Sequence, residues 1–325
     1  MTNDNRTPAP KVSIIIPSYN TAHLIGTCLD SVFSQDYQDF EAIVVNDGSP
    51  DTLKLEEALR PYREKIVYIV QANKRAAGAR NTAIGKARGE FLAFLDSDDS
   101  WVPDHLATQM AMFEHDPSLD FVYADAELVS DNPRRKTFME KCPSLGKATF
   151  EALAVERCQI PVSTVVARKS AIVKAGLFDE ALVRCDDYDM WLRTAFSGAK
   201  IGYGHKTQAR LYLGRPDSLG LPGAKMKEAY WSILEKAVRT LPLSPVQAKL
   251  VKNRIAEVKA ESLMEEGKQA LRNKNFAEAR RLFEDANRHV HRSKLTLAIR
   301  GLQLAPNSAS KAFALWTRIR RRQTS

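Results

Sequence analysis

Three carboxylates lie within four consecutive residues of this chain, at Asp96, Asp98 and Asp99. Charges this close repel one another unless a cation or a basic group neutralises them. Divalent ions such as Mg²⁺ prefer oxygen ligands and bridge carboxylates to diphosphate oxygens. There they neutralise the charge that builds up as a diphosphate departs. The pattern therefore indicates a divalent metal site for Mn²⁺ or Mg²⁺; the alternative is a solvated acidic turn that caps the following helix.

A second acidic group occurs further along, where Asp186, Asp187 and Asp189 precede the apolar run Met190–Leu192. This run is typical of the buried side of a helix. One interpretation is that Asp186 or Asp187 caps the helix, with the acidic first turn complementing the helix dipole. The other is a catalytic base, which requires a carboxylate that faces an acceptor and is ionised near neutral pH.

Two further segments carry groups that suit a nucleotide. Asp47 begins an Asp-Gly-Ser sequence that is either a turn before a helix or a carboxylate facing a base or ribose. The segment Asn73–Asn81 contains Arg75 and Arg80, and is either an ordinary basic loop or a phosphate contact at a helix start. The Gly-x-Gly-x-x-Gly fingerprint does not follow the first apolar run, which argues against a nicotinamide or flavin enzyme.

Each of these groups follows or begins a regular element that the sequence pattern predicts. Short apolar runs rich in β-branched residues predict strands over residues 12–16, 40–45, 65–70, 90–95 and 121–128. The intervening segments predict helices: one capped by Asn20 or Thr21, one capped by Ser49 with Pro50 in its first turn, one over residues 76–87, and one from Pro103 to Glu114.

Strands that alternate with helices predict an α/β fold, with a mostly parallel sheet covered by helices on both faces. In such sheets, ligands bind beyond the carboxyl ends of the strands. Tyr19, Asp47 and Asp96 all follow strand ends, so we expect them to lie along one edge of the sheet. The organisation therefore predicts a nucleotide site at that edge.

Composition excludes several other classes. The 325 residues include 44% apolar and 27% charged residues, which is ordinary for a globular protein. The four cysteines have no paired spacing, so we expect neither a disulfide framework nor a zinc site. The same unpaired cysteines favour a reducing cytoplasm. We see no secretory signal and no apolar run long enough to cross a bilayer. The chain also lacks a nucleic-acid-binding motif, so we expect no nucleic acid partner.

The net charge of +9 is unevenly distributed along the chain. From residue 225 onward there are 22 Lys or Arg against 9 Asp or Glu, while the preceding residues hold 26 against 30. The same C-terminal part has helical patterns only. We therefore expect three parts: a loose polar arm over residues 1–11, an α/β domain over 12–223, and a basic helical extension over 224–325.

Two features stand out in the helical extension. The apolar and small residues between Leu263 and Ala286 match the spacing of one tetratricopeptide-like helix pair, and Gly301 follows Gly267 by 34 residues, which suggests a second unit. A last helix over residues 310–322 combines Trp316 and other apolar residues with several arginines. It is either a solvated basic tail or a peripheral contact with an anionic membrane surface.

In its first two thirds the chain resembles glycosyltransferase family 2, a family with the GT-A fold. The resemblance covers about residues 12–218 and is carried by six motifs in order. These motifs are Val-Ser-Ile-Ile-Ile-Pro-Ser-Tyr-Asn, Val-Val-Asn-Asp-Gly-Ser-Pro-Asp, Asn-Lys-Arg-Ala-Ala-Gly-Ala-Arg-Asn, Phe-Leu-Asp-Ser-Asp-Asp, Gly-Leu-Phe-Asp-Glu and Asp-Asp-Tyr-Asp-Met-Trp-Leu-Arg.

The resemblance implies a role for several of these residues. Pro17, Tyr19 and Asp47 would line the nucleobase pocket, and Arg75 would approach the base or the phosphates. Asp96 and Asp98 form the Asp-x-Asp signature, with Asp98 as the direct metal ligand.

The base of the family corresponds to Asp187, with Asp186 as second choice. Asp186 stands where the family more commonly has Glu. The sequence Arg215-Pro-Asp-Ser replaces a common His-Pro-Gly-Ser, so Arg215 would offer a different phosphate contact.

The activity implied is transfer of a hexose, with inversion, from a nucleotide-diphosphate sugar to an acceptor hydroxyl. The resemblance implies a UDP-linked donor, a saccharide, lipid-linked or protein acceptor, and a place in the synthesis of cell-envelope or exported polysaccharides and glycoconjugates. Two alternatives stay open at this point. One is a non-catalytic assembly or scaffold protein that uses its helical extension, and the other is a nucleotidyltransferase, which would attack phosphorus instead of a sugar carbon.

Overall fold

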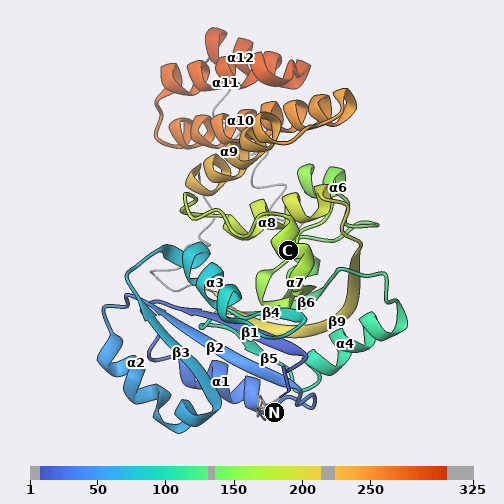
Figure 1. Ribbon diagram of the computed structural model, residues 1–325. Coiled ribbons are helices and arrows are strands. Elements are labelled where there is room, and N and C mark those ends of the chain that lie inside the picture. Colours follow the sequence, from blue (N-terminus) through green and yellow to red (C-terminus); the bar gives the residue numbers. More distant parts are fainter. Residues whose placement is uncertain (1–7, 131–135, 214–223, 306–325) are drawn as a thin grey trace, which may run out of the picture. The chain divides into compact units, whose positions relative to one another are not determined.

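Apolar runs in the first part of the chain form one mixed sheet (Figure 1). The computed structural model describes residues 8–130, 136–213 and 224–305. The chain divides into two units, residues 1–221 and 222–325. Within the described ranges the strands are β1 (Val12–Ser18), β2 (Phe40–Asp47), β3 (Ile66–Gln71), β4 (Phe91–Phe94), β5 (Ser100–Trp101), β6 (Phe121–Val129), β7 (Lys136–Thr137), β8 (Val166–Arg168) and β9 (Ile201–Tyr212).

The strand order is β3-β2-β1-β4-β8-β6-β9-β5, with β7 paired to β6. The first four strands in this order are parallel, as the sequence predicts. Beyond β4 the sheet is mixed, because β8 runs antiparallel to both β4 and β6, while β9 runs parallel to β6. The sequence pattern did not predict β5, β7 and β8, which are only two or three residues long, or β9, which contains glycines and polar residues.

Helices cover both faces of the parallel half of the sheet (Figure 1). On one face α1 (Ile25–Phe33), α2 (Thr52–Leu59) and α4 (His105–His115) pack their buried apolar residues against β1, β2 and β4. On the other face α3 (Arg75–Lys86) contacts β1 and β2. The remaining helices of this unit are α5 (Phe138–Lys141), α6 (Phe150–Ala154), α7 (Lys169–Lys174) and α8 (Asp186–Phe196).

Trp191 of α8 anchors that helix in the core. Its ring is 1% exposed and packs edge-on against Phe94, Phe121 and Phe178. Aromatic pairs in this arrangement stabilise a core beyond the area that they bury. As a result, the first turn of α8 is held beside the end of β4, where the Asp96–Asp99 loop begins.

Two helices begin later than the sequence suggested. The first starts at Ile25, since Asn20 has a φ of 55° and the hydroxyl of Thr21 bonds Ser18 and Ser97 instead of a helix N–H. The second starts at Thr52, with Asp51 in the capping position, because the Ser49 hydroxyl accepts a hydrogen bond from the N–H of Asn20. Both prospective caps therefore tie loops together at the carboxyl edge of the sheet.

Pro17 does not end the first strand, which continues to Ser18. The pairing between β1 and β4 stops at Ile15 and Phe94, so only β2 pairs alongside Pro17. Lys11, assigned to the loose arm, is also held: its ammonium pairs with Glu90 at 2.6 Å and its carbonyl accepts from the N–H of Phe91.

The second unit consists of α9 (Ala224–Thr240), α10 (Pro245–Arg272), α11 (Phe276–Val290) and α12 (Ser293–Leu304) over its described residues. The helix α10 begins with a capping box, in which Ser244 and Gln247 bond each other's backbone N–H groups, and with Pro245 in its first turn. Along the described ranges, no helix combines the length and the apolar character that crossing a membrane requires.

The predicted tetratricopeptide-like pair corresponds to α10 and α11, which pack through one apolar cluster. Gly267 of α10 lies against the ring of Phe283, where an added Cβ would come within 2.5 Å of the ring. Gly301 lies in α12, which packs beside α11. The last predicted helix, residues 310–322, falls outside the described ranges.

Candidate active site

The carboxyl ends of β1 and β2 bring the predicted nucleobase residues together. Ser18 pairs with Asn46, and Asp47 pairs with Gln71 of β3. Pro17 is half-buried in β1, while the side chain of Tyr19 just beyond the strand is 50% exposed. An accessible tyrosine ring beside a buried carboxylate is an arrangement that suits a flat polar ligand.

Asp47 has one satisfied and one open oxygen. Its Oδ1 accepts from Gln71 Nε2 at 2.7 Å and from the backbone N–H of Lys74 at 2.8 Å. Its Oδ2 is buried and has no hydrogen-bond partner among the described residues. A buried carboxylate oxygen without a partner is costly, so an N–H donor from a ligand would be stabilised there.

Gly48 allows the loop after β2 to lie this close to the segment after β3. Its φ is 64°, and an added Cβ would come within 2.8 Å of the backbone nitrogen of Asn73. Only glycine fits such a left-handed position at a close backbone approach without strain.

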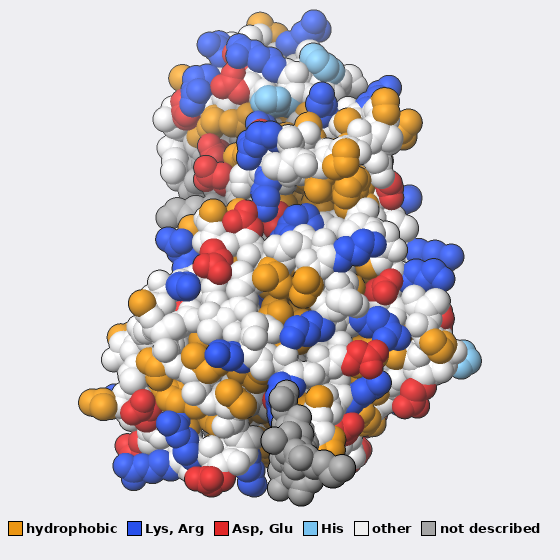
Figure 2. Space-filling view, in the orientation of Figure 1, with side chains coloured by type: hydrophobic (Ala, Val, Ile, Leu, Met, Phe, Trp, Pro, Cys, Tyr) orange, Lys and Arg blue, Asp and Glu red, His pale blue; other side chains and the backbone are white. Residues whose placement is uncertain are grey.

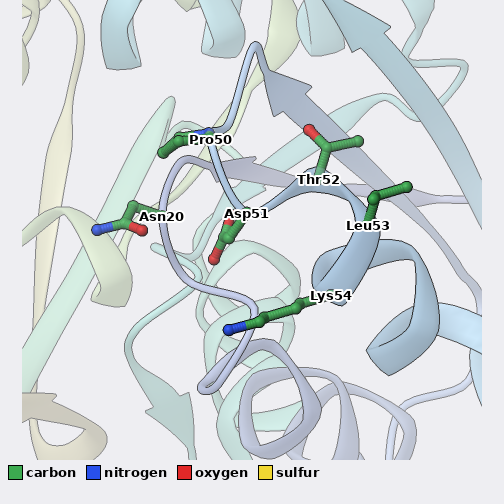
Figure 3. Close-up of a pocket in the computed structure, with 6 residues that line it drawn as sticks. All are labelled: Asn20, Pro50, Asp51, Thr52, Leu53 and Lys54. Atoms are coloured by element: carbon green, nitrogen blue, oxygen red, sulfur yellow. The ribbon is translucent and has the colours of Figure 1, made fainter.

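A shallow pocket adjoins the same loops (Figure 3). Its volume is about 370 Å³, and it is lined by Asn20, Pro50, Asp51, Thr52, Leu53 and Lys54. In Figure 3, Lys54 extends toward the side on which Asp51 and Asn20 lie, whereas Leu53 points away. The carboxylates of the Asp96–Asp99 loop do not line it, so this pocket borders the predicted site without containing its acidic centre.

The three carboxylates after β4 lie close together in space. One oxygen each from Asp96, Asp98 and Asp99 falls within 4.8 Å of the others. Asp99 is 8% exposed and already occupied: Ser163 Oγ donates to its Oδ2 at 2.6 Å and the N–H of Tyr212 donates to its Oδ1 at 3.3 Å. Burial, then the neighbouring carboxylates, raise the pKa of Asp99 above its usual range.

This donor set fits a hard divalent cation. Several carboxylate oxygens converge, and a cation among them would relieve the repulsion between charges held this close. Both oxygens of Asp99 accept hydrogen bonds, whereas Asp96 pairs with Arg80 through Oδ1, so the residues that would hold the ion are Asp96 and Asp98.

A buried arginine connects this loop to the second acidic group. The side chain of Arg80 in α3 is 5% exposed, and its Nη2 lies 2.6 Å from Asp96 Oδ1. Its Nη1 lies 2.5 Å from Asp186 Oδ2. Burial alone would lower the pKa of the Arg80 guanidinium, but Asp96 and Asp186 outweigh this effect and raise the pKa above its usual value.

The sequence pattern around Arg80 indicated an ordinary basic loop or a phosphate contact, and did not predict this bridge. One signal was available: the residues just before Arg80 in the helix are the small residues Ala77, Gly78 and Ala79, which are all buried. A single arginine on the buried side of a small-residue helix requires internal anionic partners. Ser163 and Tyr212 had no such signal, because they approach Asp99 from distant parts of the sequence.

Asp187 lies at the start of α8, beside Asp186. It does not cap the helix, because Cys185 takes the capping position with a φ of 55° and makes no side-chain cap bond. The Asp187 Oδ1 accepts from the N–H of Tyr188 at 2.8 Å. Burial and the adjoining Asp186 raise the pKa of Asp187 to about 6. A carboxylate with that pKa is ionised at neutral pH and still basic enough to accept a proton.

Two further phosphate contacts were predicted, Arg75 and Arg215. Arg75 is exposed at the start of α3, with a φ of 61°, and its backbone N–H bonds Asn73 Oδ1 at 3.2 Å. Arg215 lies outside the described residues. The structure therefore brings Asp96 and Asp186 together through Arg80, with Asp98 close to Asp96 and Asp187 next to Asp186 in the chain. Asp47 and Pro17 lie on the neighbouring strand ends of the same sheet edge.

Comparison with known proteins bears on the family of the chain. The family model described as "Glycosyl transferase family 2" matches residues 13–168. A UDP-Glc:α-D-GlcNAc-diphosphoundecaprenol β-1,3-glucosyltransferase of Escherichia coli, WfgD, is 35% identical over 182 residues, covering 56% of this chain and 68% of that protein. The amylovoran biosynthesis glycosyltransferase AmsB of Erwinia amylovora is 31% identical over 200 residues, covering 58% of this chain and 65% of AmsB.

Solved structures share the fold over most of the chain. TarS residues 1–349 of S. aureus, in complex with UDP-GlcNAc, align with a TM-score of 0.62 at 18% identity, covering 90% of this chain and 87% of that one. The mannosyltransferase PcManGT of Pyrobaculum calidifontis, in complex with GDP-Man and Mn²⁺, aligns with a TM-score of 0.60 at 20% identity, covering 94% of this chain and 84% of that one. The expected GT-A-like fold is thereby confirmed.

Proposed function

Because this chain belongs to glycosyl transferase family 2, we propose that it transfers a hexose, with inversion, from a nucleotide-diphosphate sugar to an acceptor hydroxyl. The observation that carries this proposal is the bridge through Arg80. Arg80 connects the acidic loop at Asp96, which suits a divalent metal, to Asp186. The adjoining Asp187 has a pKa that suits a general base. Donor-binding and proton-accepting groups must lie side by side for such a displacement.

On the donor side, Asp96 and Asp98 would hold Mn²⁺ or Mg²⁺ against the diphosphate. The bound ion supplies charge neutralisation for the departing nucleoside diphosphate. The residues themselves fix the position of the donor. Asp99, held by Ser163 and Tyr212, keeps the loop in one conformation, so that Asp96 and Asp98 stay oriented.

On the acceptor side, Asp187 would take the acceptor proton, with Asp186 as the second candidate. The acceptor oxygen attacks the sugar carbon while the bond from that carbon to the phosphate oxygen breaks. The proton passes to a carboxylate oxygen of Asp187. A single direct displacement inverts the configuration at the sugar carbon, and it needs a base rather than a protein nucleophile.

A UDP-linked donor is supported by Asp47. Uracil presents an N–H group, and the unpartnered Oδ2 of Asp47 is an acceptor at the expected base position. Pro17, Tyr19 and Arg75 would complete this side, and Arg215 would add a phosphate contact. The names of WfgD and of the TarS complex, which both contain a UDP-linked sugar, support the same choice.

For the acceptor, the relatives support a saccharide-bearing molecule. WfgD is named for a diphosphoundecaprenol-linked acceptor and AmsB for amylovoran biosynthesis. We propose a lipid-linked or polymeric saccharide acceptor and a role in the synthesis of cell-envelope or exported glycans at the cytoplasmic side. In this proposal residues 12–223 form the catalytic domain, and residues 224–325 form a helical extension.

The experiment is a panel of UDP-glucose, UDP-N-acetylglucosamine, UDP-galactose and GDP-mannose, each tested with Mn²⁺, with Mg²⁺ and with chelator. The matching donor should raise the melting temperature by mass action and release free nucleoside diphosphate. Release of a sugar 1-phosphate instead, through attack on phosphorus, would identify a nucleotidyltransferase. No stabilisation and no product with any donor or metal would favour a scaffold protein.

A further inference from the structure

We propose that Arg80 is a positioning residue that fixes the acidic loop of Asp96 and the start of α8 as one unit. This inference rests on the proposed function, which makes Asp96 part of the donor side of the site and Asp186–Asp187 part of the acceptor side. Arg80 itself touches neither reacting group in this assignment. It acts by holding both carboxylates on one rigid guanidinium.

The geometry at Arg80 is that of a bridge between distant segments. Asp96 is 16 residues away from Arg80 in the sequence and Asp186 is 106 residues away, yet both carboxylates lie within 2.6 Å of one guanidinium. The planar guanidinium presents its N–H groups in a fixed fork. Two carboxylates on one fork therefore cannot move independently.

Burial makes this bridge costly to break. The Arg80 side chain is 5% exposed, and the Asp186 side chain is 13% exposed. The guanidinium also lies over the ring of Phe178, 5.4 Å from its centroid. The Asp96 side chain is 30% exposed, so the cost of an unpaired charge is greatest at Arg80 and Asp186, and the paired arrangement is the one that persists.

The next residue of α3 strengthens the same connection. Asn81 Nδ2 donates to the carbonyl of Phe178 at 2.8 Å, and Asn81 Oδ1 accepts from the N–H of Phe178 at 2.9 Å. The segment that leads into α8 is therefore attached to α3 by two consecutive side chains. The helix α3, which contacts β1 and β2, serves as the support for both halves of the site.

A positioning role predicts that occupancy of the donor side is felt at the acceptor side. When Mn²⁺ and UDP engage Asp96 and Asp98, the bridge should hold Asp186 more firmly and slow the opening of the first turn of α8. Without the bridge, the donor side should still bind Mn²⁺ and UDP, but the opening of the first turn of α8 should no longer slow down. A displacement of reacting groups by about 1 Å costs roughly 10²-fold in rate.

The test measures hydrogen exchange of backbone amides at residues 186–190, with and without Mn²⁺ plus UDP, in the wild type, Arg80→Ala and Arg80→Lys. The matched control is Arg193→Ala. Arg193 is also a buried arginine, 14% exposed and paired with Asp189 in α8, but it does not contact Asp96 or Asp186. Calorimetry with UDP and Mn²⁺, and the turnover of UDP-glucose to UDP, are measured on the same proteins.

We expect Mn²⁺ with UDP to slow exchange at the start of α8 in the wild type and in Arg193→Ala, and to have no such effect in Arg80→Ala. The affinity of Arg80→Ala for UDP should change far less than kcat, which should fall roughly 10²-fold. Arg80→Lys keeps the charge but not the fork, so its values should lie between those of the wild type and Arg80→Ala.

The same exchange response in Arg80→Ala as in the wild type would overturn the proposal, and so would an equal loss in Arg193→Ala. If wild-type protein binds neither UDP nor GDP in the presence of Mn²⁺, the proposed function fails instead. The bridge is then judged on ligand-free protein. In the ligand-free protein, Arg80→Lys should speed hydrogen exchange at the start of α8 roughly tenfold, the effect of losing one charge-assisted hydrogen bond. Unchanged exchange in this variant would refute the positioning role of Arg80.

Discussion

At the scale of single residues, the candidate site consists of carboxylates whose surroundings differ. Asp99 is satisfied by Ser163 and Tyr212, Asp96 by Arg80, and Asp187 by a single N–H group. Burial and neighbouring charge set the pKa of a carboxylate. Carboxylates in different environments can therefore differ in whether they stay ionised or accept a proton. Sequence patterns reveal the carboxylates but not these partners.

The substitution Asp187→Asn tests the base directly. It keeps the size of the side chain but removes its ability to accept the acceptor proton, so transfer should fall roughly 10²–10⁴-fold. Donor affinity should stay nearly unchanged, since the lost interaction acts in the transition state. Initial rates and donor calorimetry measure the two quantities separately. Retained turnover would transfer the role to Asp186.

Asp98→Asn is the matched comparison on the donor side. If Asp98 is a metal ligand as proposed, loss of its charge should weaken the binding of UDP and of Mn²⁺ together, whereas Asp187→Asn should weaken neither. Calorimetry of UDP with Mn²⁺ and with chelator measures the difference. Equal affinity of wild type and Asp98→Asn for both ligands would exclude Asp98 as a metal ligand.

The raised pKa of Asp187 predicts two opposite pH dependences. Activity should fall as the pH drops through about 6, because the base becomes protonated. Stability behaves the other way: a carboxyl whose pKa is higher in the folded chain favours folding when protonated, and this contribution is lost as the pH rises through about 6. Asp187→Asn should therefore be more stable than wild type by about 3 kcal/mol at pH 8, with a higher melting temperature, and should have a similar melting temperature at pH 4. A lower melting temperature for the variant at pH 8 would contradict this.

At the scale of elements, the sequence predicted the parallel half of the sheet well and the mixed half poorly. The strands β1 to β4 and β6 are apolar runs, so their composition alone indicates them. The short strands β5 and β8 owe their existence to partners supplied by distant segments, which no local pattern contains. The same limit explains why Arg80 was noticed but its two partners were not: the contacts join residues on α3, after β4 and on α8.

Two helical glycines allow a matched test of packing between elements. An alanine at Gly267 would place its Cβ within 2.5 Å of the Phe283 ring, whereas an alanine at Gly85 in α3 would meet nothing within 4 Å. Gly267→Ala should destabilise the second unit by about 1–3 kcal/mol through overpacking. Gly85→Ala should be neutral or stabilise by about 1 kcal/mol, as expected for removing a glycine from a helix interior. Calorimetric unfolding of the full chain checks both, and equal melting temperatures would count against the observed α10–α11 packing.

At the scale of the whole molecule, the two units differ in charge. Many basic residues of the described helices have acidic neighbours, such as Arg281 with Glu278 and Asp285, and Lys259 with Glu235. Basic and acidic side chains are interspersed on the face shown in Figure 2. Residues 225–305 hold 17 Lys or Arg against 9 Asp or Glu, and residues 306–325, outside the described ranges, add five more basic residues with no acidic residue among them.

This distribution predicts peripheral attachment to anionic membranes through the last residues. Flotation with phosphatidylserine-containing vesicles should recover the full chain at low salt and less of it as salt is added, since surface charges are screened. A chain truncated at Ser308 should not float, and neutral phosphatidylcholine vesicles serve as the control. Equal recovery of both chains would show that the tail makes no such contact.

The acidic loop is fixed at both of its ends. It leaves β4 and enters β5, where Ser100 pairs with Arg210 of β9, and the indole N–H of Trp101 donates to the carbonyl of Ser163 at 2.6 Å. Because the loop is already held in place, the protein loses little chain entropy when a ligand binds to it. Discrimination between donor sugars must then arise from segments that can still rearrange, so directed evolution of a new donor preference should succeed outside residues 95–101 and stall within them.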